Sequence, residues 1–237
     1  MISKIYVINL ASRSDRRREM YRELKRIGLG SDNPAVEIFT ATRPGDAGAF
    51  PSIGAHGCFL SHLGVLRRAQ QNGDNALLLL EDDATFTPDG ATHFEAALQA
   101  LETTEWSMAY LGYRIDSQDT IEMAQKQSEH WCQVSPQANV ETAHAVMIHK
   151  HTLGLLIAYL ERMMARPPGH PSGGPMHVDG AYYWFRREHP ECATLLTLTP
   201  YVVQRPSKSD ITPNPWKDNL PFTPLLRSLK ARLRAQR

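Results

Sequence analysis

Short apolar runs alternate with longer amphipathic stretches along this chain of 237 residues. The runs that predict strands span residues 5–10, 36–40, 77–80, 106–111, 142–148, 193–198 and 201–204. The stretches with apolar side chains at helical spacing span residues 14–27, 54–72, 93–101 and 152–164. Strands and helices in alternation predict an α/β fold, with a mostly parallel sheet that carries helices on both faces.

The apolar run at residues 77–80 is followed at once by three acids. These acids are Glu81, Asp82 and Asp83. A continuous apolar run between polar turns is typical of a strand buried on both faces, so the acids lie at its carboxyl end. In open α/β sheets, ligands bind in the crevice at that edge. Adjacent carboxylates repel one another unless a cation compensates them, which predicts a hard divalent metal. The alternative is a solvated acidic turn after a core strand.

The first predicted helix follows the first strand and begins with basic residues. Ser12 or Ser14 can cap this helix, and Gly28 ends it. Arg13 and Arg16 then lie near its N-terminus, where a cation opposes the helix dipole. A nucleotide phosphate or the acids of the central strand would supply the anion that this placement needs. A solvated basic face is the alternative.

Glycines open the second predicted helix, at residues 54–72. Gly54 and Gly57 lie where this helix opens, and glycines at such a start let backbone N–H groups approach an anion closely. Ser61 and His62 add polar groups near the same end. A single histidine in such a helix is more often a packed core residue than a ligand, so both interpretations of His62 stay open.

Two stretches lack a regular period. Residues 113–130 are polar and acidic and predict a loop with some helix. Residues 166–175 are rich in proline and glycine, a composition that cannot hold regular structure and is typical of a mobile lid. The far end of this lid leads to His177 and Asp179.

The cysteines and the apolar runs limit the cofactors and the compartment. Cys58, Cys132 and Cys192 are far apart and lack a CxxC spacing, so neither a disulfide framework nor a zinc site is predicted. The N-terminal apolar run is too short for a signal peptide, and no stretch of about 18 apolar residues could span a bilayer. A cytoplasmic location in a reducing compartment is therefore expected.

Charge is segregated along the chain, although the formal net charge is only +1. Residues 81–129 are strongly acidic, and the two ends are basic. We expect one domain over residues 1–216 and a basic amphipathic tail over residues 217–237. Such a tail suits an anionic membrane surface, here the inner face of the plasma membrane. A frayed, solvated terminus is the alternative.

Four blocks along the chain combine into a family pattern. They are Tyr6-Val7-Ile8-Asn9-Leu10 with Arg13, Asp15 and Arg16; Gly57-Cys58-Phe59-Leu60-Ser61-His62; Leu79-Leu80-Glu81-Asp82-Asp83-Ala84; and Ser209-Asp210-Ile211 after Pro200 and Gln204. Together they resemble glycosyltransferase family 25, whose bacterial members include lipopolysaccharide galactosyltransferases. The blocks span nearly the whole chain in the order expected for that family.

The resemblance implies a GT-A type, Rossmann-like fold, a nucleotide-sugar donor (most often UDP-galactose) and a Mn²⁺ or Mg²⁺ ion held by the acidic motif. A divalent ion would neutralise the leaving phosphates, and an inverting reaction needs a base for the acceptor hydroxyl. Asp83 is the first choice as direct metal ligand. The candidate metal ligands are Asp83 and Glu81. The candidate catalytic residue is Asp179, with His177 and His62 as alternates. The candidate nucleotide-binding residues are Asn9, Arg13, Arg16, Gly57, Ser61 and Asp82.

The expected function is a metal-dependent, inverting transfer of a hexose, galactose, from a UDP-sugar to a hydroxyl of a bacterial surface glycan such as lipopolysaccharide. The expected partners are a nucleotide sugar and a glycolipid or oligosaccharide acceptor. A nucleotidyltransferase could use the same nucleotide site and acids. A third hypothesis is a non-catalytic or nucleic-acid-binding protein of this fold. Its basic ends lack the interleaved aromatic residues that stack on bases, which argues against a nucleic-acid partner.

Overall fold

The computed structural model describes residues 2–30, 32–115 and 124–205. Three of the expectations above fall outside these ranges. They are the block at residues 209–211, the C-terminal part of the expected domain at residues 206–216, and the basic tail at residues 217–237. None of the helices in the described part is both long and apolar enough to cross a membrane.

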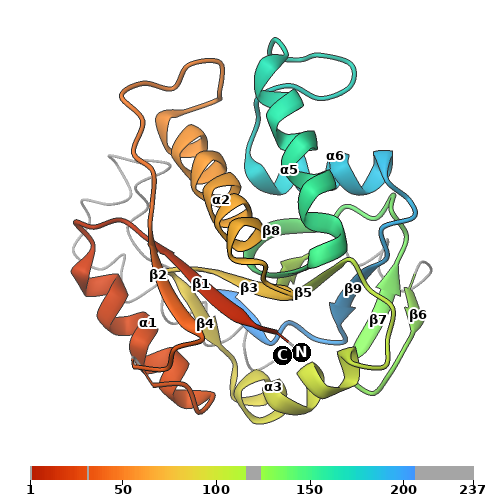
Figure 1. Ribbon diagram of the computed structural model, residues 1–237. Coiled ribbons are helices and arrows are strands. Elements are labelled where there is room, and N and C mark those ends of the chain that lie inside the picture. Colours follow the sequence, from red (N-terminus) through yellow and green to blue (C-terminus); the bar gives the residue numbers. More distant parts are fainter. Residues whose placement is uncertain (1, 31, 116–123, 206–237) are drawn as a thin grey trace, which may run out of the picture.

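A mixed eight-stranded sheet forms the centre of the described structure (Figure 1). Its strands are, in spatial order, β2 (Val36–Thr40), β1 (Lys4–Asn9), β3 (Ala76–Glu81), β8 (Glu141–His149), β5 (Met108–Arg114), β9 (Thr194–Thr197), β7 (Trp131–Val134) and β6 (Ala124–Lys126). β1 pairs in parallel with β2 and β3, and β5 pairs in parallel with β9. Only β7 and β8 run against the other strands of this sheet, since each is antiparallel to both neighbours. The predicted mostly parallel α/β sheet is thus confirmed.

Helices cover both faces of the sheet. The helices α2 (Ile53–Asn72), α5 (Lys150–Ala165) and α6 (Val178–Glu188) lie on one face, and α1 (Ser14–Arg26) and α3 (Pro88–Leu101) lie on the other (Figure 1). A hydrophobic core lies on each face of the sheet, and alternate side chains of β3 pack into the two cores. Leu77 and Leu79 pack in one core, and Leu78 and Leu80 pack in the other. All four leucines are fully buried. The continuous apolar run is therefore explained by burial on both faces.

A tight turn at Asp82 and Asp83 connects β3 to β4 (Ala84–Phe86), which pairs with the antiparallel β10 (Val202–Gln204). Arg205, directly after β10, donates its backbone N–H to the Asp83 carbonyl oxygen at 2.7 Å. Its guanidinium donates to the Asp82 carbonyl oxygen at 2.5 Å. This small second sheet fixes the backbone of the acidic turn, which the sequence pattern alone did not indicate.

The prediction for the start of the first helix is wrong, and that for the second is confirmed to within one residue. The N-cap of α1 is Arg13 rather than Ser12 or Ser14, and its guanidinium bonds Asp15 in the first helical turn. An acid at that position complements the helix dipole, so the helix begins well without a serine cap. α2 begins at Ile53, one residue before the predicted start at residue 54, and Ser52 caps it by accepting a hydrogen bond from the Ala55 N–H.

The expectation of a loop with some helix at residues 113–130 is wrong at residues 113–114 and 124–126, whereas residues 127–130 form no helix or strand. β5 continues through Arg114, and residues 124–126 form β6, paired with β7. A strand of three residues is too short for a periodic signal, so its pairing partner decides its conformation. Residues 166–175 have no helix or strand, as predicted. Arg166 donates hydrogen bonds to the carbonyl oxygens of Ser172 and Gly173 within that loop.

Candidate active site

A cleft of about 260 Å³ lies at the carboxyl ends of β1 and β3. These ends meet at one edge of the sheet because the two strands are parallel. The wall of the cleft includes Leu10 and Ser12 after β1, Arg16 of α1, residues 41–44 after β2, the first turns of α2, and the three acids. The sequence therefore correctly indicated the edge at which a cavity forms.

Asp82 is held by protein groups on both carboxylate oxygens. Its Oδ1 accepts from Arg16 Nη1 at 2.7 Å, and its Oδ2 accepts from Asn9 Nδ2 at 2.7 Å. The Asp82 residue is only 7% exposed, and Asn9 is 2% exposed. The basic residue at the start of α1 thus finds its anion in the central strand, one of the two sources that the sequence left open. This arrangement joins α1, β1 and the acidic turn.

Asp83 has the opposite environment. Its Oδ1 is buried and has no hydrogen-bond partner among residues 2–30, 32–115 and 124–205, and Arg16 lies 3.9 Å from its Oδ2. Burial and the neighbouring Glu81 carboxylate raise the pKa of Asp83 to about 7, against the opposing effect of Arg16. Buried polar atoms are normally satisfied, and carboxylate oxygens are the ligands that hard divalent ions prefer. An unpartnered carboxylate oxygen in the wall of a cleft therefore fits a metal-binding role.

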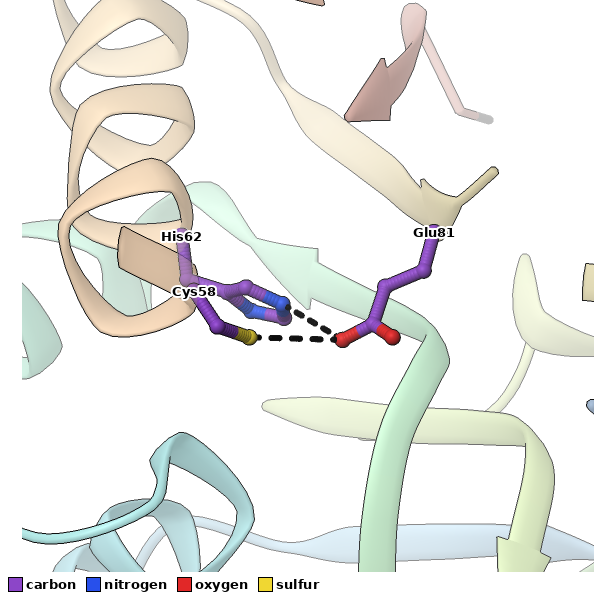
Figure 2. Close-up of side chains that lie close together, drawn as sticks. All are labelled: Cys58, His62 and Glu81. Carbon is purple, nitrogen blue, oxygen red and sulfur yellow. Dashed lines mark hydrogen bonds and ion pairs between the residues drawn. The ribbon is translucent and has the colours of Figure 1, made fainter. Parts of the chain in front are cut away.

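Two side chains of α2 contact the Glu81 carboxylate, as Figure 2 shows. His62 Nε2 lies 3.2 Å from Glu81 Oε1, and Cys58 Sγ lies 3.6 Å from the same oxygen. Burial opposes ionisation of Glu81, but the hydrogen bond and the charge of His62 outweigh it, so the pKa of Glu81 lies below its usual value. Burial, and then the charge of Glu81, raise the pKa of the Cys58 thiol.

His62 is fully buried, and both of its ring nitrogens have partners. Besides the contact with Glu81, its Nδ1 lies 3.0 Å from the hydroxyl oxygen of Tyr182 in α6. The position of Glu81 thus depends on α2 and, through His62, on α6. A fully buried imidazole with both nitrogens occupied is poorly placed to take a proton from a substrate hydroxyl.

Ser61 and Gly57 hold the loop after β2 against α2. The Ser61 hydroxyl donates to the Gly57 carbonyl oxygen at 2.6 Å and accepts from the Thr42 N–H at 2.8 Å. A Cβ atom at Gly57 would lie 2.8 Å from the Thr42 carbonyl oxygen. Glycine is required here because the loop backbone approaches the helix so closely. The loop in turn forms one wall of the cleft.

Asp179 lies in the first turn of α6 and is held by backbone donors. Its Oδ2 accepts from the Thr142 N–H at 3.2 Å, and its Oδ1 accepts from the Gly180 N–H at 2.9 Å. Thr142 has a φ of 69°, a strained conformation for a β-branched residue. Its strained backbone presents a donor to Asp179. His177, the N-cap of the same helix, is exposed.

The structure divides the predicted site residues into two groups. Those in the wall of the cleft are Arg16, Gly57, Ser61, Glu81, Asp82 and Asp83. Those that do not contribute to this wall are Asn9, Arg13, His62, His177 and Asp179. Asn9 and His62 instead orient acids of the wall, and Asp179 is close enough for its charge to act on the Cys58 thiol.

Sequence reasoning missed several residues around the cleft. Cys58 and Arg43 line it, Tyr182 supports His62, and Thr142 binds Asp179. The i, i+4 spacing of Cys58 and His62 was available, because residues four apart share a helix face. No local signal pointed to Tyr182 or Thr142, which reach the site only through tertiary packing.

The sequence has detectable relatives. No profile of a known protein family matches the chain. It is 30% identical over 128 residues to a glycosyltransferase 25 family member of Anopheles gambiae, and 29% identical over 128 residues to one of Aedes aegypti. The chain is thus similar in sequence to glycosyltransferase family 25. The similarity involves 47% of this chain but only 22% and 21% of the two relatives, so the chain spans about a fifth of their length.

Solved structures give a weaker likeness. A glycosyltransferase involved in glycosylation of the major capsid of PBCV-1 matches with a TM-score of 0.43 and 10% identity, over 97% of this chain and 98% of that one. A 4-diphosphocytidyl-2C-methyl-D-erythritol synthase from Anaerococcus prevotii matches with a TM-score of 0.46 and 11% identity, over 97% and 79% of the two chains. At these scores the likeness carries no argument about function.

Proposed function

We propose that this protein is a glycosyltransferase with a GT-A type site, which transfers a hexose from a nucleotide sugar to a hydroxyl of a glycan acceptor. The observation that carries the proposal is the buried Oδ1 of Asp83, which accepts no hydrogen bond from the described residues and lies in a cleft at the carboxyl edge of a largely parallel sheet. The sequence similarity to glycosyltransferase family 25 supports the same reaction class. UDP-galactose is the proposed donor, and a surface glycan such as lipopolysaccharide is the proposed acceptor.

The residues present fit a Mn²⁺ or Mg²⁺ ion. Asp83 offers a carboxylate oxygen with no protein partner, and Glu81 lies close enough for its charge to raise the pKa of Asp83. Both line the cleft, and both supply the oxygen ligands that these ions prefer. When bound, the ion would neutralise negative charge that develops on the leaving diphosphate.

The protein groups around the cleft suit an anionic nucleotide. Arg16 lies in the wall beside the acids, and Arg43 lies in the wall formed by the loop after β2. Arg16 is bonded to Asp82, so its position is fixed before any ligand arrives. A preorganised cation costs little to order when it binds phosphate. We assign the diphosphate to the side of the cleft next to Arg16, with the loop around Arg43 covering the nucleoside.

Asp179 is the proposed base. Two backbone N–H groups fix its carboxylate, and it is partly exposed, so it can accept a proton from an acceptor hydroxyl. In an inverting reaction, this hydroxyl attacks the anomeric carbon as the bond to the diphosphate breaks, and Asp179 takes its proton. His177 is the exposed alternate on the same helix start. His62 is assigned to hold Glu81 rather than to act as base.

The test is product analysis with UDP-galactose, Mn²⁺ and an oligosaccharide or glycolipid acceptor. The proposal predicts UDP and a galactosylated acceptor, in amounts that depend on Mn²⁺. Glu161→Gln is a matched control, because Glu161 is an exposed acid of α5 paired with Arg67 and is not part of the cleft wall. It should retain transfer, whereas Asp83→Asn should lose it. Release of pyrophosphate instead of UDP would make the protein a nucleotidyltransferase and overturn the proposal.

A further inference from the structure

Three side chains of different chemistry converge beside the acidic turn. Cys58 and His62 project from the same face of α2, and Glu81 reaches them from the end of β3 (Figure 2). One ligand atom from each of the three residues lies within 4.8 Å of the other two. His62 is fully buried, and the Glu81 side chain is 17% exposed. The three groups are therefore fixed by the core rather than gathered by chance on a mobile surface.

Two of the three distances in this cluster, those from Glu81 Oε1 to the other two ligand atoms, are close to the edges of a metal coordination tetrahedron. Typical zinc bond lengths to sulfur, nitrogen and oxygen give ligand separations of about 3.6 Å for S···O and about 3.4 Å for N···O. The observed separations are 3.6 Å from Cys58 Sγ to Glu81 Oε1 and 3.2 Å from His62 Nε2 to Glu81 Oε1. An ion could thus enter with little movement of α2 or β3.

The donor set selects a thiophilic ion. Thiolate and imidazole ligands favour Zn²⁺ and similar transition metals, whereas Mg²⁺ and Mn²⁺ prefer the all-oxygen environment around Asp83. Cys58 and Glu81 also line the cleft, so three protein ligands would leave a fourth position facing a solvent-filled space. Three ligands plus one open position is the arrangement of accessible zinc sites rather than of closed structural ones.

Tyr182 supplies the support that such a histidine ligand needs. Its hydroxyl lies 3.0 Å from His62 Nδ1, so an Nδ1–H can donate to it while Nε2 faces Cys58 and Glu81. A metal-bound histidine normally has a partner on its other ring nitrogen, which fixes the ring and the tautomer. Binding would replace the thiol proton of Cys58 by the ion and release that proton to solvent.

We propose that Cys58, His62 and Glu81 form a Zn²⁺ site next to the hard-ion site at Asp83. The two sites share Glu81, so Zn²⁺ competes with Mn²⁺ for this carboxylate and acts as an inhibitor of Mn²⁺-dependent chemistry in the cleft. The sequence predicted no zinc site because it contains no CxxC spacing. The ligands come instead from one helical turn and from a strand end that the fold brings beside it.

Co²⁺ is the probe, because a thiolate ligand gives it a near-ultraviolet charge-transfer band that oxygen ligands do not give. The metal-free protein is titrated with Co²⁺ in the absence of any nucleotide sugar, and Zn²⁺ is then added as competitor. The wild-type protein should develop the band with one equivalent of Co²⁺ and lose it on addition of Zn²⁺. Cys58→Ala should abolish the band and weaken Zn²⁺ binding by about 100-fold or more.

Matched controls identify the thiolate and separate the two sites. The chain has three cysteines, so Cys132→Ala and Cys192→Ala should both keep the band. Asp83→Asn should keep it as well, since Asp83 is not part of the cluster. A band that is absent from the wild-type protein, or that persists in Cys58→Ala, overturns the proposal. Because no step requires sugar transfer, failure of the proposed function leaves this test intact.

Circular dichroism of each metal-free variant checks the fold. Cys58→Ala removes one small, partly buried side chain and should fold as the wild-type protein does. Glu81→Gln offers a second variant, which keeps the side-chain volume and should weaken Co²⁺ binding without removing the thiolate band at saturation. An unchanged affinity in Glu81→Gln would contradict the assigned role of Glu81.

Discussion

Asp82 and Asp83 occupy the same turn, yet their carboxylates have different surroundings. On the side of α1, Asp82 is paired with Arg16 and Asn9. Asp83 has a buried oxygen with no partner in the described part of the chain, and it has a neighbouring acid, Glu81. A compensated carboxylate stabilises the fold, whereas an uncompensated one is destabilising unless a ligand arrives. The comparison therefore supports our proposal that Asp83 is the functional acid, whereas Asp82 is held by protein groups.

The largest expected effect comes from Asp83→Asn. This change keeps the size of the side chain and removes the negative charge that the proposed ion needs. We expect kcat for transfer to fall by about 10³-fold, the scale of losing a main electrostatic group in an active site. The measurement is steady-state kinetics at saturating Mn²⁺. Activity within about two-fold of wild type would show that the two acids do not differ in the proposed way.

The same variant tests the pH dependence of stability without metal. The pKa of Asp83 is raised from 3.8 to about 7 in the folded protein, so the folded state binds a proton more tightly than the unfolded state. The contribution of this group to the free energy of unfolding therefore falls as pH rises from about 4 to about 7. Asp83→Asn should remove this fall and stabilise the metal-free protein at pH 8, by at most about 4 kcal/mol. Urea unfolding at pH 5 and pH 8 measures the difference, and a loss of stability at pH 8 would contradict the assignment.

Asp179→Asn tests the proposed base. Asparagine can accept only one of the two backbone hydrogen bonds, from Thr142 or from Gly180, and cannot take a proton, so kcat should fall by about 10²-fold to 10³-fold. The KM for the donor should stay nearly constant, because Asp179 does not line the cleft. Separate measurement of kcat and KM decides the point. A rise in KM at unchanged kcat would make Asp179 a binding residue.

Asp82→Asn removes the charge of the acid that the protein compensates. It removes the 2.7 Å ion pair with the Arg16 guanidinium, which is only 11% exposed, so that Arg16 keeps Asp83 at 3.9 Å as an ionisable neighbour. Removal of one member of a buried ion pair costs about 3 kcal/mol. Urea unfolding should show this loss, in contrast to the gain expected for Asp83→Asn. Equal effects of the two substitutions would remove the distinction between the acids.

Gly57→Ala has the smallest expected effect and tests the wall of the cleft. The added methyl group would press on the Thr42 carbonyl oxygen and cost about 1–3 kcal/mol. The loop after β2 would move away from α2, so the KM for the donor should rise more than kcat falls. Gly154→Ala, in α5, is a milder control, since its methyl group would meet only the end of the Gln70 side chain at 3.3 Å. Equal donor KM values for both variants would show that the loop does not bind the donor.

The fold was largely predictable because its strongest signals are local. The run at residues 77–80 is apolar on both faces, and the helix of residues 53–72 has its apolar stripe and a Gly73 stop in the left-handed conformation. β6 and β7 were missed because they are only three and four residues long, so their pairing at the edge of the sheet decides their structure. Such tertiary pairing leaves little trace in a single sequence.

The site was predictable in composition but not in geometry. The acids and Arg16 were named from charge placed at a strand end and a helix start, and they do line the cleft. The different surroundings of Asp82 and Asp83 depend on which side chains α1 and α2 present, and that follows only from the folded structure. The cluster of Cys58, His62 and Glu81 joins residues about 20 positions apart, and spacing rules for zinc motifs do not include it.

The most direct test of the central claim is the thermal stability of the wild-type and Asp83→Asn proteins with UDP-galactose, with and without Mn²⁺. A ligand that binds only the folded state adds about 2.7 kcal/mol of apparent stability at a concentration of 100 times its Kd. The account predicts a Mn²⁺-dependent rise in Tm for the wild-type protein and none for Asp83→Asn. The same rise in both proteins, or no rise in a folded wild-type sample, would contradict the claim that Asp83 holds the ion that binds the donor.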